Sequence, residues 1–422
     1  MDIKKLHDLF LKCDSICTDT RSNCKGSLFF ALKGGNFNGN DFALESLSNG
    51  ANYAVVDDRT IDHPKCLLVD DVLKTLQKLS NFHRKKLKKT KIIALTGSNG
   101  KTTTKELISC VLNTTYKTSS TIGNFNNHIG VPLSLLNIED DTEFAVIEMG
   151  ANHQGEISLL TKLVEPDFGL ITNFGKAHLE GFGGIDGVIK GKKELYTWLL
   201  NNHKPIIINY DDPIQRKYVD NRSITYGKNK SATFMFSQKE NELVEFEYQC
   251  ESIKSNLIGD YNFYNLICAT TIGLHFNVSI KKIRSAIKNY KSKNNRSEIR
   301  FVNKTKIILD AYNANPTSIY AAIQSFVKLQ GPKVIIIGEM LELGKFSKTE
   351  HQKIINNLEK LKIKSFFVGN EFFNLKKQSP NLFFFKTKED LMKEFPIEKI
   401  KSKNILIKGS RFLEMEKILE QT

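Results

Sequence analysis

The chain has 422 residues, which is too long for one ordinary domain and predicts two or three. Its content of 40% hydrophobic and 25% charged residues is typical of a globular protein. The net charge of +15 raises the question of nucleic acid, but the lysines are spread along the whole chain and no recognition helix, zinc-finger spacing or RNA-binding signature is present. Anionic nucleotide substrates explain the charge more simply, so no nucleic-acid partner is expected.

The cysteines and the apolar segments indicate in which cellular compartment the protein works. Seven cysteines, an odd number, argue against a disulfide framework, and the cluster of Cys13, Cys17 and Cys24 lacks the partners that a zinc site needs. We expect reduced thiols in a cytoplasmic protein. The N-terminus has no apolar signal region, and nowhere do 18 apolar residues run together, so neither secretion nor membrane insertion is expected.

Residues 1–88 predict a small mixed unit in which strands alternate with helices. Two polar stretches in it, 18–21 and 31–39, combine hydroxyl groups, an arginine and glycines, which suit a diphosphate or sugar ligand. Ordinary turns explain the same residues, and from this segment alone they are the favoured explanation. The dense basic run His83–Lys91 predicts a solvated helix end that leads into a linker. Strands are expected at 27–32, 53–56 and 66–69.

The second unit, residues 89–297, begins with the stretch TGSNGKTTTKE at 96–106. An apolar run at 92–95 predicts a strand before this stretch, and residues 106–112 predict a helix after it. The order of strand, glycine-rich turn and helix is typical of a phosphate-binding loop. A glycine-rich surface turn is the plain alternative, and the flanking strand and helix make it the weaker one.

Each residue type in this loop has a chemical reason to be there. Gly97 and Gly100 let the backbone turn tightly and bring its N–H groups close to an anion. Lys101 can reach a terminal phosphate, and the hydroxyl group of Thr102 or Thr103 can bind Mg²⁺. The general pattern has one more glycine at its start, so this loop is the shorter G-x-x-G-K-T form.

Further buried strands are predicted in this unit at 144–147, 168–172 and 205–209, with helical stretches between several of them. This alternation is typical of a largely parallel sheet, in which ligands gather at the carboxyl ends of the strands. Residues 225–255 predict a peripheral hairpin region, and residues 259–274 predict an apolar helix. The polar residues at the predicted strand ends are Glu148, Asn173, His178, Asn209, Asp211 and Asp212.

Residues 298–422 predict a third unit with a doubly wound pattern of alternating strands and helices. Its strand ends carry the stretches DAYNANP, GEMLELG and KGSR, which begin at Asp310, Gly338 and Lys408. The predicted fold class is α/β with three domains: a small mixed N-terminal domain, a central parallel sheet of the P-loop ATPase type, and a Rossmann-like C-terminal domain. Strands are expected at 306–309, 334–337, 365–368, 382–385 and 405–407.

These motifs together resemble the ATP-dependent Mur ligases, which add amino acids to the UDP-linked muramoyl peptide precursor of the bacterial cell wall. The resemblance runs from TDTR at residue 18 to KGSR at residue 408, so it covers essentially the whole chain. Most of the family shares TGSNGKTTTKE. The stretches NNHIGVPL, EMGANHQGEI, DAYNANPTS and GEMLELG are more discriminating, and they resemble the branch that adds the dipeptide D-Ala-D-Ala.

The resemblance implies a ligase that joins D-Ala-D-Ala to UDP-N-acetylmuramoyl-tripeptide during peptidoglycan precursor synthesis in the bacterial cytoplasm. ATP would phosphorylate the terminal carboxylate of the peptide to an acyl phosphate, which the amine of the dipeptide would then attack. The expected cofactors are ATP, two Mg²⁺ ions and a carbamylated lysine at Lys192, and a monomer is expected. The C-terminal unit is expected to close onto the central one and to exclude water.

The family's site residues carry over position by position. Lys101 would hold the transferred phosphate, Thr102 and Glu148 one Mg²⁺, and His178 a second Mg²⁺ that a carbamate on Lys192 supports. Lys192 competes for this register with its neighbours Lys190 and Lys193, and is chosen because it stands two residues before Glu194 and four before an aromatic residue. A buried lysine can be neutral enough to become a carbamate. The remaining ATP contacts would be Gly97, Ser98, Asn99, Gly100, Thr103, Asn262, Asn265, Arg296 and Asp310, and the substrate contacts Thr20, Arg21, Lys33, Asn313 and Asn315.

Three alternatives stay open at this point. A sibling Mur ligase that adds a single amino acid would share most of the motifs. A folylpolyglutamate synthase, which has a similar core architecture, should lack the TDTR-bearing unit and the DAYNANP stretch, and both are present. A P-loop nucleotide switch, the alternative without catalysis, would need neither a carbamate lysine nor a site that is split between units.

Overall fold

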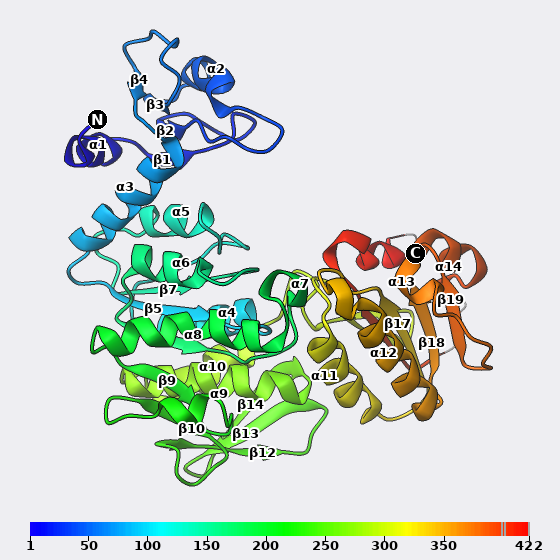
Figure 1. The fold of residues 1–422 in the computed structure, drawn as a ribbon. Coiled ribbons are helices and arrows are strands. Elements are labelled where there is room, and N and C mark those ends of the chain that lie inside the picture. The colour runs from blue at the N-terminus through cyan, green and yellow to red at the C-terminus, as the bar shows by residue number, and fades with distance from the viewer. Residues whose placement is uncertain (398–399, 401, 421–422) are drawn as a thin grey trace.

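The computed structural model describes residues 1–397, 400 and 402–420. Figure 1 shows three α/β units in chain order, each built around its own sheet, with the N-terminal unit at the top of the view and the C-terminal unit at its right. The predicted fold class is confirmed, because the described sheets are largely parallel and carry helices on their faces. Among the described residues, no helix combines the length and the apolar composition needed to cross a bilayer.

The N-terminal unit holds a parallel sheet in the order β1-β2-β3-β4. Every residue of β2 is buried, because α1 and α3 cover one face of the sheet and the segment around α2 covers the other. The predicted strands are confirmed, and the short polar β1 is an addition. The elements are α1 (Ile3–Phe10), β1 (Ser15–Cys17), β2 (Ser27–Phe30), a 3-10 turn (Gly39–Phe42), α2 (Ala43–Ser48), β3 (Tyr53–Val56), β4 (Cys66–Leu68) and α3 (Val72–Lys86).

Helix α3 connects the N-terminal unit to the central unit, and its last turn contains part of the basic run. The prediction of a solvated helix end is wrong for His83 and Arg84. His83 is buried, and its Nε2 lies 2.9 Å from the carbonyl oxygen of Ile138. The guanidinium of Arg84 donates to the carbonyl oxygens of Val164 and Glu165, at 3.0 and 2.8 Å. These side chains therefore fasten α3 to the central unit, because Arg84 satisfies carbonyls at the end of a central helix that no backbone N–H reaches.

The central unit is a parallel sheet in the order β11-β10-β9-β8-β5-β7-β6. Helices α4, α9 and α10 pack on one face, while α5, α6 and α8 pack on the other, so both faces are apolar. The predicted hairpin is confirmed in β13 and β14, but its first residues belong to β10 of the main sheet. The strands are β5 (Lys91–Thr96), β6 (Thr118–Ser120), β7 (Phe144–Glu148), β8 (Phe168–Ile171), β9 (Ile206–Asn209), β10 (Ile224–Gly227), β11 (Phe234–Met235), β12 (Ser237–Lys239), β13 (Leu243–Tyr248) and β14 (Glu251–Ile258). The helices are α4 (Lys101–Leu112), α5 (Gly130–Leu136), α6 (Glu156–Val164), α7 (Leu179–Phe182), α8 (Ile185–Asn201), α9 (Asp260–His275) and α10 (Ile280–Asn289).

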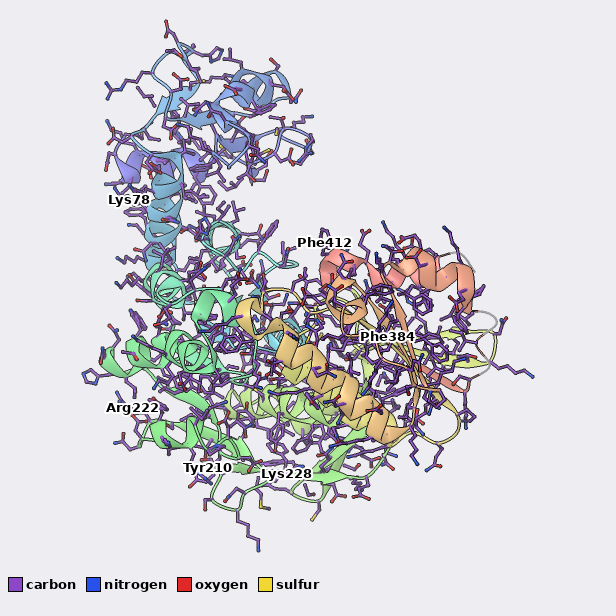
Figure 2. All side chains as sticks on the ribbon, turned by 45° about the vertical axis from the view of Figure 1, so that its right-hand side comes forward. Lys78, Tyr210, Arg222, Lys228, Phe384 and Phe412 are labelled. Atoms are coloured by element: carbon purple, nitrogen blue, oxygen red, sulfur yellow. The ribbon has the colours of Figure 1, made fainter. Side chains whose placement is uncertain are left out.

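The C-terminal unit has a sheet in the order β15-β16-β20-β17-β18-β19, in which only the pairing of β15 with β16 is antiparallel among the described strands. Phenylalanines fill much of its core. Phe384 on β19, which Figure 2 labels, stacks on Phe367 with ring centroids 4.9 Å apart. The elements are β15 (Glu298–Val302), β16 (Thr305–Asp310), α11 (Pro316–Val327), β17 (Lys333–Gly338), α12 (Ser347–Leu361), β18 (Lys364–Val368), α13 (Asn370–Phe373), β19 (Leu382–Phe385), α14 (Lys388–Glu394) and β20 (Asn404–Lys408).

Two buried histidines face each other where α1 meets α3. Nε2 of His7 lies 3.1 Å from Nδ1 of His83. Because Nε2 of His83 faces the carbonyl of Ile138, it carries the ring proton, and Nδ1 is left to accept from His7. Burial lowers the pKa of His7, and the charges of His83 and Lys86 add to this while Asp8 and Asp140 oppose it. Burial also lowers the pKa of His83, against the Ile138 hydrogen bond and Asp140.

The first prediction concerns the pH dependence of folding. Both histidines have a lower pKa in the folded chain than in the unfolded chain, so their contribution to stability is complete above about pH 6.5 and is lost as the pH falls through the lowered values. We expect the melting temperature to fall between about pH 8 and pH 5.5. The double variant His7→Gln/His83→Gln should flatten that slope. The exposed residue His203, changed to Asn, is the control, and an unchanged slope in the double variant would contradict the assignment.

Candidate active site

The loop between β5 and α4 has the backbone of a phosphate-binding loop. Gly97 has φ +146° and Gly100 has φ +78°, and side chains rarely adopt either conformation. Space is also limiting, because a Cβ at Gly97 would lie 1.9 Å from Oγ1 of Thr172 and one at Gly100 would lie 2.6 Å from Oδ1 of Asn265. Helix α4 starts at Lys101, so its free N–H groups point toward the loop. The predicted strand, turn and helix are confirmed.

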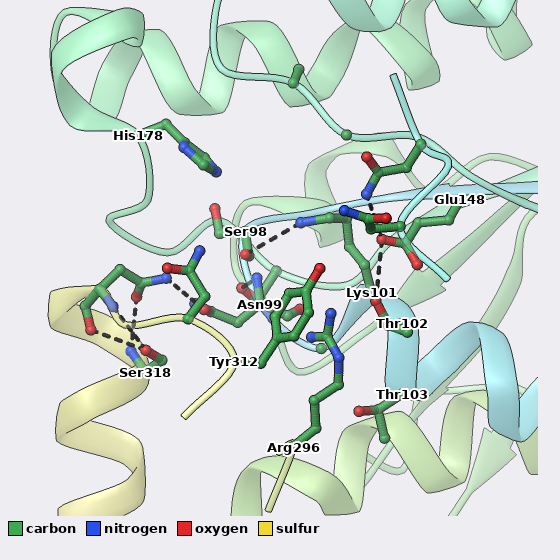
Figure 3. A pocket seen from close by; sticks show the side chains of 18 of the residues that line it. Ser98, Asn99, Lys101, Thr102, Thr103, Glu148, His178, Arg296, Tyr312 and Ser318 are labelled. Atoms are coloured by element: carbon green, nitrogen blue, oxygen red, sulfur yellow. Dashed lines mark hydrogen bonds between the residues drawn. The ribbon is translucent and has the colours of Figure 1, made fainter. Parts of the chain in front are cut away.

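A cavity of about 650 Å³ opens at the carboxyl ends of the central strands, between the central and C-terminal units (Figure 3). It brings together most of the predicted site residues from segments far apart in the sequence. From the central unit these are Ser98, Asn99, Gly100, Lys101, Thr102, Thr103, Glu148, His178, Asn262 and Asn265, and from the C-terminal side Arg296, Asp310, Asn313 and Asn315. Gly97 and Lys192 lie behind this lining.

Asn99 at the tip of the loop is held from several sides. Its N–H donates to Oδ1 of Asn173 at 3.1 Å, and Nδ2 of Asn173 returns a hydrogen bond to its carbonyl oxygen at 2.9 Å. From the C-terminal unit, Nδ2 of Asn315 donates to Oδ1 of Asn99 at 2.7 Å. Asn315 also caps α11 with a reciprocal pair of bonds to Ser318, which fixes its side chain (Figure 3). The C-terminal unit thus touches the phosphate loop directly.

Behind the loop, Thr104 and two asparagines of α9 form a chain of hydrogen bonds. Oγ1 of Thr104 donates to Oδ1 of Asn265 at 3.1 Å, and Nδ2 of Asn265 donates to Oδ1 of Asn262 at 2.9 Å. Nδ2 of Asn262 in turn donates to the carbonyl oxygen of Ile258 at 2.8 Å. These amides hold one another in fixed orientations on the wall of the cavity.

Glu148 ends strand β7 with its carboxylate almost completely buried beside the loop. Oε1 accepts from Oγ1 of Thr102 at 3.3 Å and from Nδ2 of Asn126 at 2.8 Å. Oε2 is buried and has no hydrogen-bond partner among the described residues. A buried carboxylate oxygen without a partner is costly unless a cation or a donor occupies the space next to it. Glu148 and Thr102 therefore fit the oxygen ligands that Mg²⁺ prefers.

Two buried lysines of the predicted site, Lys101 and Lys192, have depressed pKa values. Burial lowers the pKa of Lys101, with Arg296 adding to the effect and Glu148 opposing it, and its Nζ donates to the carbonyl oxygen of Gly97 at 2.8 Å. Burial drives the pKa of Lys192 well below its ordinary value, and the charge of Lys101 lowers it further. Nζ of Lys192 has the carbonyl of Ala151 as a partner at 3.1 Å. Its lowered pKa favours the neutral form of the Lys192 amine, which is the form that a carbamate requires.

His178 stands at the N-cap position of the short helix α7, and its side chain makes no capping hydrogen bond but points toward the cavity from the side opposite Glu148 (Figure 3). Its Nδ1 lies against the carboxylate of Glu342, a residue of the C-terminal unit. The pairing holds the pKa of Glu342 below its ordinary value. Only Nε2 of His178 therefore remains to bind a metal ion. No group of three His, Cys, Asp or Glu side chains that could hold a metal by itself occurs in the part of the chain that the structure describes.

The C-terminal wall of the cavity carries two cations. The Arg296 guanidinium lies 3.5 Å from the centroid of the Tyr312 ring (Figure 3). Lys408 is buried, and its Nζ contacts Oδ2 of Asp310 at 2.6 Å and the carbonyl oxygen of Asn313 at 3.2 Å. A neighbouring hydrogen bond joins the Tyr261 and Ser297 hydroxyl groups at 2.7 Å. An anionic ligand that lies between the phosphate loop and this wall would meet positive charge on both sides.

The predicted substrate residues of the N-terminal unit lie outside this cavity. The exposed Arg21 pairs with Asp19 at 2.7 Å, and Thr20 stands between them in the same turn. Lys33 is also exposed and pairs with Asp57 at 2.9 Å. The structure thus brings the ATP and metal residues together, but not these three.

Four residues that line the cavity or hold its lining were not assigned a role from the sequence. Asn126 holds Glu148, Asn173 holds Asn99, Tyr312 stacks on Arg296, and Lys408 pairs with Asp310. All four lie in the stretches that follow predicted strands or in the motifs quoted above. Their position in the sequence was therefore a signal, but their partners are distant in the chain.

Comparisons with known proteins agree with this geometry. The model of the Mur ligase middle domain matches residues 95–273, and that of the Mur ligase, glutamate ligase domain matches residues 295–411. A UDP-N-acetylmuramoyl-tripeptide–D-alanyl-D-alanine ligase of Bacillus subtilis is 33% identical, with 96% of this chain and 92% of the relative aligned.

Solved structures agree over nearly the whole length. A crystal structure of MurF from Acinetobacter baumannii is 30% identical with a TM-score of 0.88, covering 99% of this chain and 98% of that one. MurF ligase from Thermotoga maritima, solved in complex with ADP, is 27% identical with a TM-score of 0.85 and covers 97% of both chains. The shared domains, the full-length relatives and the phosphate loop in its cavity lead to one conclusion: the chain belongs to the Mur ligase family.

Proposed function

We propose that this protein uses ATP to join D-alanyl-D-alanine to UDP-N-acetylmuramoyl-tripeptide, a step in the synthesis of the peptidoglycan precursor. The names of relatives that match over nearly the full length support this substrate pair. The observation that carries the proposal is the cavity itself, in which a phosphate loop faces Asp310 of the C-terminal unit and Arg296, which lies just before the start of that unit. We propose that the protein works as a monomer in the bacterial cytoplasm.

The chain's own residues suit an acyl-phosphate route. The γ-phosphoryl group of ATP passes to the peptide carboxylate, the dipeptide amine attacks the acyl carbon, and phosphate leaves as the amide bond forms. Two anions must approach each other in the first step, so charge neutralisation and alignment make up most of the catalytic work. Lys101 and the α4 N-terminus hold the transferred group, and Arg296 meets it from the C-terminal wall. Asp310 binds the ribose, and Asn262 and Asn265 line the adenine site.

Thr102 and Glu148 would hold one Mg²⁺ ion, and the buried Oε2 of Glu148, which has no hydrogen-bond partner among the described residues, supports a cation there. His178 would hold a second ion, together with a carbamate on Lys192. When bound, the metal neutralises phosphate charge and orients the phosphate oxygens. We propose that Lys192 carries a carbamate, which its burial and depressed pKa support. A carbamate replaces a cation by a carboxylate-like anion, which suits a metal ligand.

The ends of the substrates are assigned to the outer units. Asn313 and Asn315 lie at the junction where the dipeptide would enter, and Thr20, Arg21 and Lys33 would contact the UDP group on the N-terminal unit.

We propose domains at 1–88, 89–297 and 298–422, which is consistent with the end of α3 at Lys86 and the start of β15 at Glu298.

The second prediction tests the reaction and its acceptor together. Purified protein with UDP-N-acetylmuramoyl-tripeptide and ATP should release phosphate only when D-Ala-D-Ala is present. Lys101→Ala should lower the rate by about 100-fold or more, since it removes a cation aimed at the transferred phosphate. The exposed Lys281→Ala should behave like the unchanged protein. Release with a single amino acid would instead point to a sibling Mur ligase, and no release with any muropeptide would leave the nucleotide switch.

The third prediction concerns the modified lysine. Protein equilibrated with ¹³C-labelled bicarbonate should show one carbamate carbonyl resonance, and Lys192→Gln should remove it and lower the ligation rate by about 10- to 100-fold. The adjacent variants Lys190→Gln and Lys193→Gln should keep both the resonance and the rate. A resonance that survives in Lys192→Gln, or one that is missing from the unchanged protein, would contradict the assignment.

A further inference from the structure

Residues 172–176, here called the bridging segment, lie between the phosphate loop and the C-terminal unit. They follow β8 and precede His178. On the side of the loop, the N–H of Ser98 donates to the carbonyl oxygen of Asn173 at 3.0 Å, and the Ser98 hydroxyl donates to that of Gly175 at 2.8 Å. Oγ1 of Thr172 donates to the carbonyl oxygen of Asn99 at 2.6 Å. A shift of the bridging segment would therefore move the phosphate loop.

On its other side, the bridging segment is fastened to two helices of the C-terminal unit. The N–H of Lys176 donates to Oγ1 of Thr317 on α11 at 2.9 Å. Nζ of Lys176 contacts Oε1 of Glu350 on α12 at 2.8 Å. Gly175 is the point of closest approach, because a Cβ there would lie 2.7 Å from Nδ2 of Asn99 and 3.2 Å from Cβ of Thr317. The segment is thus in contact with both units at once.

The Lys176–Glu350 pair differs from the other ion pairs across this boundary. Its carboxylate is the buried one: the side chain of Glu350 is 7% exposed, while Lys176 is 40% exposed. The carboxylates of the other described ion pairs between the two units, Asp260 with Lys328, Glu242 with Lys306 and Glu342 with His178, are 54%, 52% and 50% exposed. Burial alone would raise the pKa of Glu350, but the hydrogen bonds from Lys176 and Lys353 outweigh it and hold that pKa below its ordinary value. Both lysines contact Oε1 of Glu350, while Oε2 is buried without a hydrogen-bond partner among the described residues. Removing a lysine from a buried carboxylate costs more than breaking a surface pair.

We propose that Lys176 is a positioning residue: its ion pair with Glu350 anchors the C-terminal unit to the bridging segment, and the segment sets the phosphate loop in its working geometry. When the C-terminal unit is in place, the loop and the cations Arg296 and Lys101 face one ligand. When the Lys176–Glu350 pair is broken, the bridging segment no longer holds the phosphate loop in one position, and the nucleotide binds more weakly. The proposal rests on the proposed function, but its nucleotide-binding part holds for any ATP-dependent activity of this cavity.

The chain offers a matched control for this fourth prediction. Lys353 contacts the same Glu350 oxygen at 2.8 Å, but from the same helix, so it does not cross the boundary. We expect Lys176→Met to weaken ADP affinity in the presence of Mg²⁺, measured by calorimetry, by about tenfold, and Lys353→Met to change it by less than about twofold. Lys328→Met, which removes the exposed pair, should also have little effect. The melting temperatures of the three variants should lie within about 2 °C of the unchanged protein.

Two further variants distinguish a role of Lys176 in positioning the phosphate loop from a general loss of protein stability. Glu350→Gln should weaken ADP affinity as Lys176→Met does, and the double variant should be no worse than either alone, because both changes break one contact. Gly175→Ala should give the same loss by forcing the segment away from Asn99, and it serves if Lys176→Met does not fold.

Equal losses in Lys176→Met and Lys353→Met, losses that multiply in the double variant, or unchanged affinity in Lys176→Met would each overturn the proposal. Absence of dipeptide-dependent phosphate release in the unchanged protein is a separate result. It would reject the proposed ligase reaction, while the ADP affinities would still decide whether Lys176 positions the loop.

Discussion

Two positions between β5 and α4, Gly97 and Gly100, have no space for a side chain. The arrangement of the whole cavity depends on this close packing. Gly97 lies against Thr172 and Gly100 against Asn265, so the loop is enclosed by β8 on one side and α9 on the other. A loop packed this tightly keeps its N–H groups in one orientation as long as the residues around it stay in place. The charged groups around it can then be placed to fit an anion whose position is fixed in advance.

The cavity places two positive charges, those of Lys101 and Arg296, where an anionic ligand would bind. Burial lowers the pKa of Lys101 and the nearby charge of Arg296 adds to this, although the opposite charge of Glu148 has the larger effect of the two neighbours. On the other wall, Lys408 is already neutralised by Asp310. Phosphate groups between Lys101 and Arg296 would turn repulsion across the boundary into attraction. The same anion that serves as substrate thus favours the contact between the two units.

Sequence reasoning located the strands well because most of them are short apolar runs that are buried on both faces, as in β5, β7 and β17. It missed β1 and β6, which have three residues each, and β15, whose residues are partly exposed and which pairs antiparallel at an edge. The phosphate loop was predictable because its chemistry is local. The partner of Asn126 or Lys408 was not, because a hydrogen bond between residues far apart leaves no local pattern.

The basic run His83–Lys91 is a second case in which hydrogen-bond partners could not be predicted from the sequence. Its composition is that of a solvent-facing helix end, and Lys85 and Lys86 do lie in solvent. His83 and Arg84 are turned inward by the period of the helix, and their partners are carbonyl oxygens, which no composition reveals. Patterns of residue type predict which side of an element is apolar, but they do not predict which polar groups a buried cation or imidazole will meet.

Helix α3 has a consequence for the choice of substrate. Its first turns belong to the core of the N-terminal unit through Leu76 and Leu79, and its last turn is fastened to the central unit through His83 and Arg84. One continuous helix of 15 residues, about 22 Å long, thus spans the joint between the two units. The last turn of α3 is held near the start of β5, and the phosphate loop follows the far end of that strand. The length of the helix therefore helps to set the distance between the N-terminal unit, with its proposed UDP contacts, and the phosphate loop. A donor whose peptide is too short or too long would hold its head group correctly and still present its carboxylate at the wrong place.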